Sequence, residues 1–299
     1  MHASPHTPLA ALPSITVPAD LAVPLAANAN LPDPLGKIGN LELKLANKAK
    51  EIRRAQKLRY KVFFEEMSAQ PDIAARLMRR DADIFDSVCD HLLVRDFAPR
   101  TGLIAKKRTV GTYRLLRQEV AEKNFGFYTQ SEFDIAPLIA RHRHLNFLEL
   151  GRSCVLAPWR DRRTVELLWH GIWAYVLAHR IDVMIGCASL DGTDPDRLAL
   201  PLSFLHHFAR APEEWRASAL PHRAVDMNRM PKEAIDAKRA LRELPPLIKG
   251  YLRLGAFIGD GAVIDRQFGT TDVLMILPVA AINARYIEHF GAEATRHAA

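Results

Sequence analysis

Cysteine is scarce in this sequence of 299 residues, and no two cysteines lie close together. The three are Cys89, Cys154 and Cys187, an odd number without a C-x-x-C pair. Small secreted domains held by disulfides carry more cysteines, usually in even numbers. The sequence therefore excludes a disulfide scaffold and predicts reduced thiols in a cytoplasmic protein.

The residue spacing of a metal site is also missing. There is no H-E-x-x-H motif, and the neighbouring histidines have no cysteine or carboxylate at zinc-ligand spacing. These histidines are His142, His144, His206 and His207. The sequence predicts no metal ligands.

Long hydrophobic runs and an early positive charge are absent too. No stretch reaches the roughly 18 consecutive apolar residues of a membrane-spanning helix. No Lys or Arg precedes Lys37, so the charged start of a secretory signal is missing. The first 36 residues hold seven of the 19 prolines, each of which removes a helix donor. Residues 1–38 are therefore predicted to be a disordered Ala/Pro-rich arm, and contact with a membrane surface stays open.

The charge balance favours an acidic partner. Lys and Arg number 41 against 34 Asp and Glu, a formal net charge of +7. Nucleic acid, anionic lipid and an acidic carrier protein all attract such a surface. Aromatic residues for base stacking are lacking around the basic clusters at 106–108 and 160–163, apart from Trp159. This argues against nucleic acid and leaves the other two.

Periodicity predicts a mixed succession of strands and helices. Strands are expected at 41–46, 91–96, 109–116, 147–156, 183–190, 262–266 and 273–277. Helices are expected at 48–67, 164–180, 247–254 and 280–290. This order predicts an α/β (mixed α+β) fold with a mixed central sheet flanked by helices. One domain is expected over residues 39–299, with an insertion at about 191–246.

Several motifs occur in a recognisable order. They are LRYKVFFEE, DIFD followed by CDHLLV, VGTYRLL, GFYTQSEFD, LELGRSCV followed by PWR and LLWHGIWAY, LIKGYLRLGA and FGTTDVLMIL. Over residues 40 to 290 the series resembles the N-acyltransferases that make lyso-ornithine lipid from L-ornithine and 3-hydroxyacyl carrier protein. Those enzymes belong to the GNAT superfamily and are similar to acyl-homoserine-lactone synthases. The resemblance implies a GNAT-type fold with a C-terminal extension.

The resemblance also implies site residues. Glu149 and Arg152 match an E-x-x-R pair and are implied to be catalytic. The implied substrate-binding residues are Arg59, Phe63, Asp83, Asp86 and Arg114. Since ornithine carries two amino groups, Asp83 and Asp86 are candidates for holding them or for ordering the first helix. No permanently bound cofactor is implied; the acyl donor is the phosphopantetheine of acidic acyl carrier protein.

The phosphate-binding loop departs from the superfamily pattern. Arg160 can stand for the first position of Q/R-x-x-G-x-G/A, but Arg163 replaces the glycine three residues later. A loop poor in glycine cannot wrap closely around two phosphates. Arg160, Arg162 and Arg163 are therefore predicted to meet a carrier protein's single phosphopantetheine phosphate, or an anionic lipid.

Glu149 lies within an apolar strand, where a carboxylate costs desolvation unless it has a partner. It can take the proton of an attacking ammonium, directly or through water. Alternatively, it can balance an arginine such as Arg114 or Arg152. Strict alternation puts Glu149 and Arg152 on opposite faces, and Gly151 between them can mark a bulge that re-aims one. Cys154 has no basic neighbour in sequence, so direct transfer is expected rather than an acyl-enzyme.

These features favour transfer of a 3-hydroxyacyl chain to the α-amine of L-ornithine by a cytoplasmic enzyme, at most peripheral to the membrane. The alternatives are an acyl-homoserine-lactone-type synthase using S-adenosylmethionine and an N-acyltransferase for lysine, glutamine or glycine. A third, non-enzymatic alternative is a basic membrane-surface binding protein.

Overall fold

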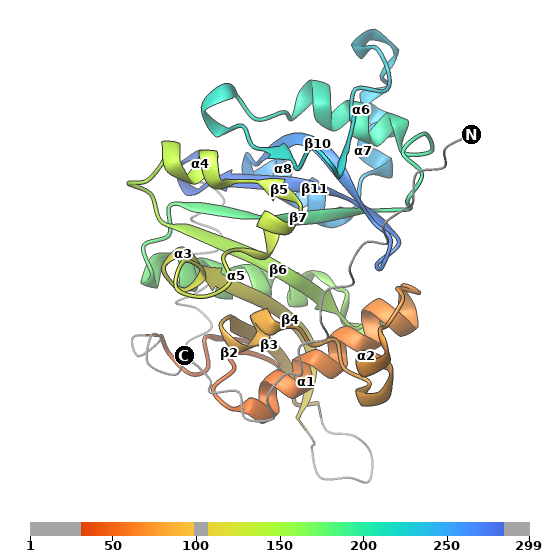
Figure 1. Cartoon of the computed structure of the whole chain (residues 1–299). Coiled ribbons are helices and arrows are strands. Elements are labelled where there is room, and N and C mark those ends of the chain that lie inside the picture. The colour runs from red at the N-terminus through yellow and green to blue at the C-terminus, as the bar shows by residue number, and fades with distance from the viewer. Residues whose placement is uncertain (1–30, 99–106, 284–299) are drawn as a thin grey trace, which may run out of the picture.

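The computed structural model describes residues 31–98 and 107–283 (Figure 1). Residues 1–30 of the predicted arm lie outside the described residues, as does the predicted last helix beyond Asn283. Residues 35–38 of the predicted arm are ordered within the fold. Leu35 is buried and Gly36–Ile38 forms strand β1, because these residues pair with the next strand at the sheet edge.

The strands form one mixed sheet in the order β1-β2-β3-β4-β6-β7-β11-β10-β8-β5, with β9 paired to β10. Neighbours are antiparallel except β6 with β7 and β8 with β10. The strands are β1 Gly36–Ile38, β2 Leu41–Leu45, β3 Asp90–Asp96, β4 Arg108–Arg117, β5 Phe133–Asp134, β6 Phe147–Val155, β7 Val183–Asp191, β8 Ser218–Ala219, β9 Ala224–Val225, β10 Phe257–Asp265 and β11 Thr270–Pro278. The seven predicted strands are confirmed, and β10 begins earlier than expected.

Helices cover both faces of this sheet. They are α1 Ala49–Tyr60, α2 Ile73–Met78, α3 Gln118–Ala121, α4 Ala136–Arg141, α5 Arg162–Ala178, α6 Ala199–Phe208, α7 Ala237–Glu243 and α8 Pro246–Leu254. α1 continues as a π-helical turn, Lys61–Glu66. Within the described part of the chain, no helix combines the length and apolar character needed to cross a bilayer.

The two faces can be assigned from residue alternation. Gly171 of α5 approaches the side chains of Leu43 and Leu92, so α5 packs on their face of the sheet. His91 and Arg114, paired across β3 and β4, belong to the opposite face and join the polar contacts of α1. In Figure 1, α1 accordingly lies in front of the sheet and α5 behind it.

Two parallel strands diverge in the middle of the sheet. β6 and β7 pair only up to Glu149 and Ile185; beyond that point β6 follows β4 and β7 follows β11. Gly186 lies at the divergence, where an added Cβ would come within 2.3 Å of the Leu150 carbonyl oxygen. A glycine is required here because the backbones approach too closely for any side chain. The sheet thereby opens beside Glu149.

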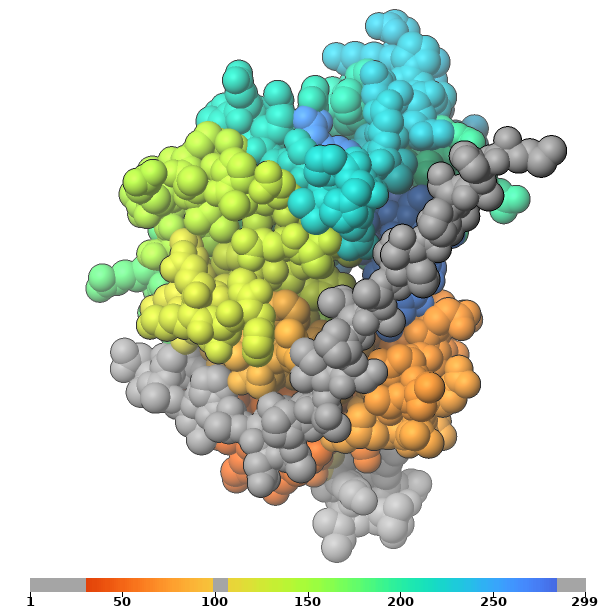
Figure 2. Space-filling view, in the orientation of Figure 1, coloured from red at the N-terminus to blue at the C-terminus, as the bar shows by residue number. Residues whose placement is uncertain are grey.

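The predicted insertion at about 191–246 is part of the main core. Leu202 and Leu205 of α6 are fully buried in the hydrophobic cluster shared with α5 and the sheet. β8 joins β10 to β5, and Trp215 stacks on His142 at 4.0 Å. Figure 2 shows this segment in contact with the chain around α4. The sequence could not predict β8 and β9, because strands of two residues are too short to show alternation.

Candidate active site

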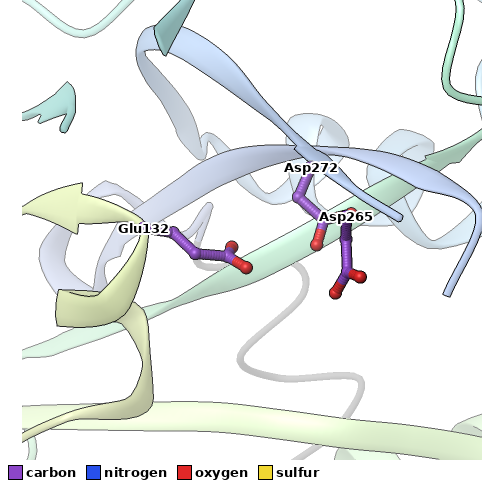
Figure 3. A group of neighbouring side chains, drawn as sticks. All are labelled: Glu132, Asp265 and Asp272. Carbon is purple, nitrogen blue, oxygen red and sulfur yellow. The ribbon is translucent and has the colours of Figure 1, made fainter. Parts of the chain in front are cut away.

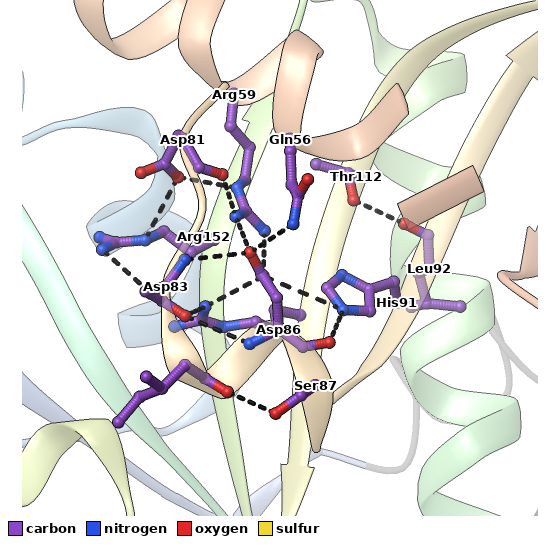
Figure 4. Close-up of polar contacts among 12 residues, drawn as sticks. Gln56, Arg59, Asp81, Asp83, Asp86, Ser87, His91, Leu92, Thr112 and Arg152 are labelled. Atoms are coloured by element: carbon purple, nitrogen blue, oxygen red, sulfur yellow. Dashed lines mark hydrogen bonds and ion pairs between the residues drawn. The ribbon is translucent and has the colours of Figure 1, made fainter. Parts of the chain in front are cut away.

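A buried ion network fixes α1 to the sheet (Figure 4). Arg59 is fully buried and donates two hydrogen bonds to the Asp86 carboxylate, at 2.8 and 2.7 Å, and one to Asp81 at 2.8 Å. Gln56 donates a further bond to Asp86. Burial opposes the charge of Asp86, but Arg59 outweighs it and holds the pKa of Asp86 far below its usual range. Arg59 and Asp86 satisfy each other and present no free group to a substrate.

Asp83 links this network to the surface. Its carboxylate caps the 3₁₀ turn Ile84–Ser87 in a capping box with Asp86. Arg114 donates to Asp83 at 2.6 Å and approaches Asp86 at 3.3 Å. The sequence motifs name the D-x-x-D pair and Arg114 separately, and the structure brings them into contact. The structure shows them ordering the floor of the site, with Asp83 its more exposed member.

Arg152 occupies a bulge in β6. From Arg114–Gly151 to Thr112–Cys154, β4 advances two residues while β6 advances three, and Arg152 has φ of +51°. The expected bulge is confirmed, with Arg152 itself in the left-handed conformation. Its guanidinium lies 5.1 Å from the Tyr128 ring centre and 4.8 Å from that of Phe268. The bulge therefore turns Arg152 towards the turn that Glu149 also contacts.

Phe63 extends this aromatic contact. It lies in the π-helical turn after α1, and its ring meets Phe268 edge-on at 5.5 Å. Phe268 belongs to the turn between β10 and β11. Phe63 therefore connects the end of the first helix with the ring that covers Arg152.

Glu149 binds backbone amides rather than an arginine. Its two carboxylate oxygens accept hydrogen bonds from the N–H groups of Tyr128, at 2.9 Å, and Thr129, at 2.7 Å. These amides begin the 3₁₀ turn Tyr128–Ser131. Burial raises the pKa of Glu149, although the Thr129 contacts oppose the rise. The expected alternative of an ion pair with Arg114 or Arg152 is not found among the described ion pairs.

The opposite side of the opening holds a small cavity of about 20 Å³. Tyr113 and Tyr251 line it with their hydroxyls 2.8 Å apart, next to Leu150 and Gly186. Cys154 is buried, and desolvation raises the pKa of its thiol well above the usual value. A thiol in this state is a poor nucleophile.

The three loop arginines each have an acidic neighbour. Arg160 pairs with Glu66 at 2.5 Å, Arg163 with Asp161 at 3.2 Å, and Arg162 with Glu166. Asp161 also caps α5 by accepting the Thr164 N–H at 2.9 Å. The N-terminus of α5 is thus occupied by a carboxylate of the chain itself.

Three carboxylates that the sequence analysis did not single out come together in the fold (Figure 3). Glu132, Asp265 and Asp272 each place one oxygen within 4.8 Å of the others. They belong to the segment before β5, the end of β10 and β11. More than 130 residues separate Glu132 from the other two, so no local spacing could reveal the group.

The comparisons with known proteins agree with the motifs. A family model described as an acetyltransferase (GNAT) domain matches residues 58–170. An L-ornithine N(alpha)-acyltransferase of Brucella abortus is 56% identical, over 88% of this chain and 92% of the relative. One of Rhizobium meliloti is 55% identical over 88% of each. The chain is also similar to the solved structure of FeeM, an N-acyl amino acid synthase from uncultured soil microbes. The two sequences are 10% identical, and the superposition covers 80% of this chain and 91% of the FeeM chain with a TM-score of 0.43.

Proposed function

This chain belongs to the L-ornithine N(alpha)-acyltransferase family, and on that premise we propose that it transfers a 3-hydroxyacyl chain from acyl carrier protein to the α-amine of L-ornithine. The product is lyso-ornithine lipid. The observation that carries the proposal is the 56% identity to the acyltransferase of Brucella abortus over 92% of that relative. It is supported by the end of the β6–β7 pairing beside Glu149 and Arg152. The family resemblance seen in the motifs is confirmed.

In the proposed reaction the neutral α-amine attacks the thioester carbonyl carbon. The N–C bond forms and the C–S bond breaks. The proton that the attacking nitrogen loses as the amide forms is taken up by the leaving phosphopantetheine thiolate. Glu149 receives the proton lost by the ammonium, directly or through water. Its two backbone hydrogen bonds fix its orientation and leave further lone pairs to accept a proton.

Arg152 supplies positive charge on the same side of the sheet. Its contacts with Asp81 and Asp83, at 3.6 and 3.5 Å, are longer than those of Arg59 or Arg114. A guanidinium held by two rings and loosely paired can still meet an anionic group. We assign it to the acceptor's carboxylate, with Arg59, Asp86 and Arg114 fixing the surrounding wall and Phe63 supporting Phe268.

The donor assignment rests on the loop before α5. Asp161 fills the helix N-terminus that would otherwise meet a pyrophosphate. Arg160, Arg162 and Arg163 are exposed at the same end and can contact an acidic carrier, although their acidic neighbours reduce the net charge. Carrier-bound substrate should therefore react faster than the acyl-CoA of equal chain length.

A peripheral contact with anionic membrane fits the lipid product. α2 exposes Ile73 and Leu77, at 80% and 81%, on the same short helix as Arg76. Apolar side chains beside a cation suit the interface of an anionic bilayer. The contact concerns release of the product and leaves the chemistry unchanged.

The decisive experiment incubates purified protein with 3-hydroxyacyl carrier protein and a panel of amino acids, and identifies the products by mass spectrometry. N-acylornithine should dominate. Parallel reactions use acyl-CoA and a variant with Arg160, Arg162 and Arg163 changed to Glu. The variant should raise the KM for the carrier, and added salt should do so for the wild type. Arg143→Glu, at an exposed site beyond α4, is the matched control.

Formation of no N-acyl amino acid from any acceptor would refute the enzymatic proposal. Equal rates with acyl-CoA would refute the carrier assignment alone.

A further inference from the structure

The carboxylates of Glu132, Asp265 and Asp272, here called the acidic triad, lie on the same side of the sheet as Glu149 and Arg152. Glu132 is 2% exposed and Asp272 is 6% exposed, while Asp265 is partly exposed and connects the group with solvent. Figure 3 shows the Glu132 carboxylate directed towards the other two. Two buried carboxylates beside a third are costly when all are ionised, and the hydrogen bond that Thr270 donates to Asp272, at 2.9 Å, offsets only part of that cost.

Positive charge reaches the triad from the described residues only at long range. Oε2 of Glu132 is buried and accepts no hydrogen bond from them. The nearest ion pair is Arg223 to Glu132 at 3.8 Å, beyond hydrogen-bonding distance. Desolvation, followed by the charge of Asp272, raises the pKa of Glu132 to about 7. A buried acceptor that faces two further carboxylates favours a positively charged donor.

Direct contacts connect the triad with the proposed catalytic groups. Glu149 accepts the Thr129 N–H, and the Thr129 hydroxyl lies 3.8 Å from the Cys187 sulfur. The Cys187 thiol in turn contacts Glu132. The positive charge of Arg152 acts on Asp272 and opposes the rise of its pKa. A ligand of the triad would therefore lie next to the groups that hold an amino acid's amine and carboxylate.

We propose that the acidic triad binds the side-chain ammonium of a diamino-acid acceptor and so selects ornithine over neutral amino acids. This inference rests on the proposed function. The α-amine then lies towards Glu149 and the α-carboxylate towards Arg152. The triad takes the role that the sequence assigned to Asp83 and Asp86, which the structure shows engaged with arginines of the chain.

The geometry suits an ammonium group. An ammonium has three donors, one for each carboxylate. With tetrahedral hydrogen bonds of about 2.8 Å, its three acceptors lie about 4.6 Å apart. The triad oxygens all lie within 4.8 Å of one another, so one ammonium group can reach all three.

The test compares ornithine with norvaline, which has the same carbon chain and lacks the side-chain amine. Wild type should prefer ornithine. Glu132→Gln and Asp272→Asn should raise the KM for ornithine about 10- to 100-fold, as expected for a lost charge-assisted hydrogen bond. Their kcat/KM for norvaline should not fall in parallel, because norvaline places no ammonium in the triad. Asp134→Asn, at an exposed carboxylate two residues from Glu132, is the matched control.

Calorimetric titration with ornithine provides a readout independent of turnover. If a buried substitution prevents folding, Asp265→Asn at the partly exposed member gives the same comparison. Variants that keep the ornithine preference of a working wild type would overturn the inference and leave the proposed function standing. A wild type that acylates neither acceptor would refute the function itself. Loss of the ornithine preference with a chelator, restored by Mg²⁺ or Ca²⁺, would show a metal in the triad and also overturn the inference.

Discussion

Glu149 is proposed to accept a proton, and it also anchors the turn at Tyr128 and Thr129. The substitution Glu149→Gln affects these two roles in measurably different ways. Glu149→Gln removes the proton acceptor, so kcat should fall by about 10²–10⁴-fold, the usual value of general-base catalysis. The loss should shrink at higher pH, where more ornithine is already neutral. The glutamine –NH₂ must also face one of the two backbone N–H groups, which should lower the free energy of unfolding by about 1–3 kcal/mol.

Thermal melting and pH-dependent kinetics on the same samples measure both effects. Glu119→Gln, at an exposed carboxylate paired with Arg117, serves as the control. Normal turnover per folded molecule of Glu149→Gln would show that Glu149 only anchors the turn.

Cys154 is expected to have no chemical part. Cys154→Ala should retain most of the wild-type rate, because a buried thiol with a raised pKa yields little thiolate. Rapid-quench mass spectrometry should find no acylated peptide containing Cys154. An acyl group trapped on this cysteine during turnover would instead demonstrate a covalent intermediate.

The sequence motifs singled out residues that stand close together along the chain and missed a group whose members are far apart. Glu149, Gly151 and Arg152 stand together in one strand, so the bulge could be expected from their spacing. Asp83 and Asp86 likewise form their capping box within one turn. Glu132 and Asp272 meet only through the sheet pairing of distant segments, and neither carries a motif. Burial, and after it the charge of Asp272, raises the pKa of Glu132, and neither is visible in the sequence.

At the scale of elements, the close approach of β6 and β7 at the point where their pairing ends depends on Gly186. An alanine there would place its Cβ 2.3 Å from the Leu150 carbonyl oxygen, so the strands would have to move apart. Gly186→Ala should reduce stability by about 1–3 kcal/mol, as overpacking usually does, and should lower kcat/KM through displacement of Glu149.

Denaturant unfolding and steady-state kinetics test this prediction. The control is Gly250→Ala in α8, where nothing lies within 4 Å of an added Cβ. That change should be neutral or stabilise by up to about 1 kcal/mol through helix propensity. Equal stability of the two variants would show that the close approach at Gly186 is not required.

Regular elements followed from the sequence better than the connections did. The longer strands alternate or form apolar runs, and α1 and α5 show clear helical periodicity, so most of them were predicted close to their observed bounds; the start of β10 and the short strands β1, β5, β8 and β9 were not. The π-helical turn after α1 has the composition of ordinary helix and could not be told from it. The segment at 191–246 was expected to be an insertion because it is polar and rich in Pro and Arg. Its core contacts, including those of fully buried Leu202, depend on tertiary packing and could not be seen in the sequence.

For the molecule as a whole, the acidic triad should lower the stability of the unliganded fold while it favours binding of a cation. The pH dependence of the free energy of unfolding should show this cost. Burial and the neighbouring charges of Asp272 and Asp265 raise the pKa of Glu132 to about 7, against the effects of Arg223 and Cys187. A raised carboxyl pKa favours the protonated folded form. The contribution of Glu132 to stability should therefore fall as pH rises from about 4.5 to 7, by about 3 kcal/mol in total.

Other groups oppose this slope, so the wild-type profile alone cannot isolate it. Burial lowers the pKa of His91, which makes the fold more stable as pH rises towards 6.5. The difference between wild type and Glu132→Gln removes such shared terms. Because glutamine resembles the protonated acid, the variant should equal wild type near pH 4 and exceed its stability at pH 8.

Ornithine at pH 8 should then raise the melting temperature of wild type and leave that of Glu132→Gln almost unchanged, since the bound ammonium relieves a repulsion that the variant lacks. A variant less stable than wild type at pH 8 would mean that the Glu132 carboxylate is already neutralised within the fold, and the triad would then have no need of a substrate cation.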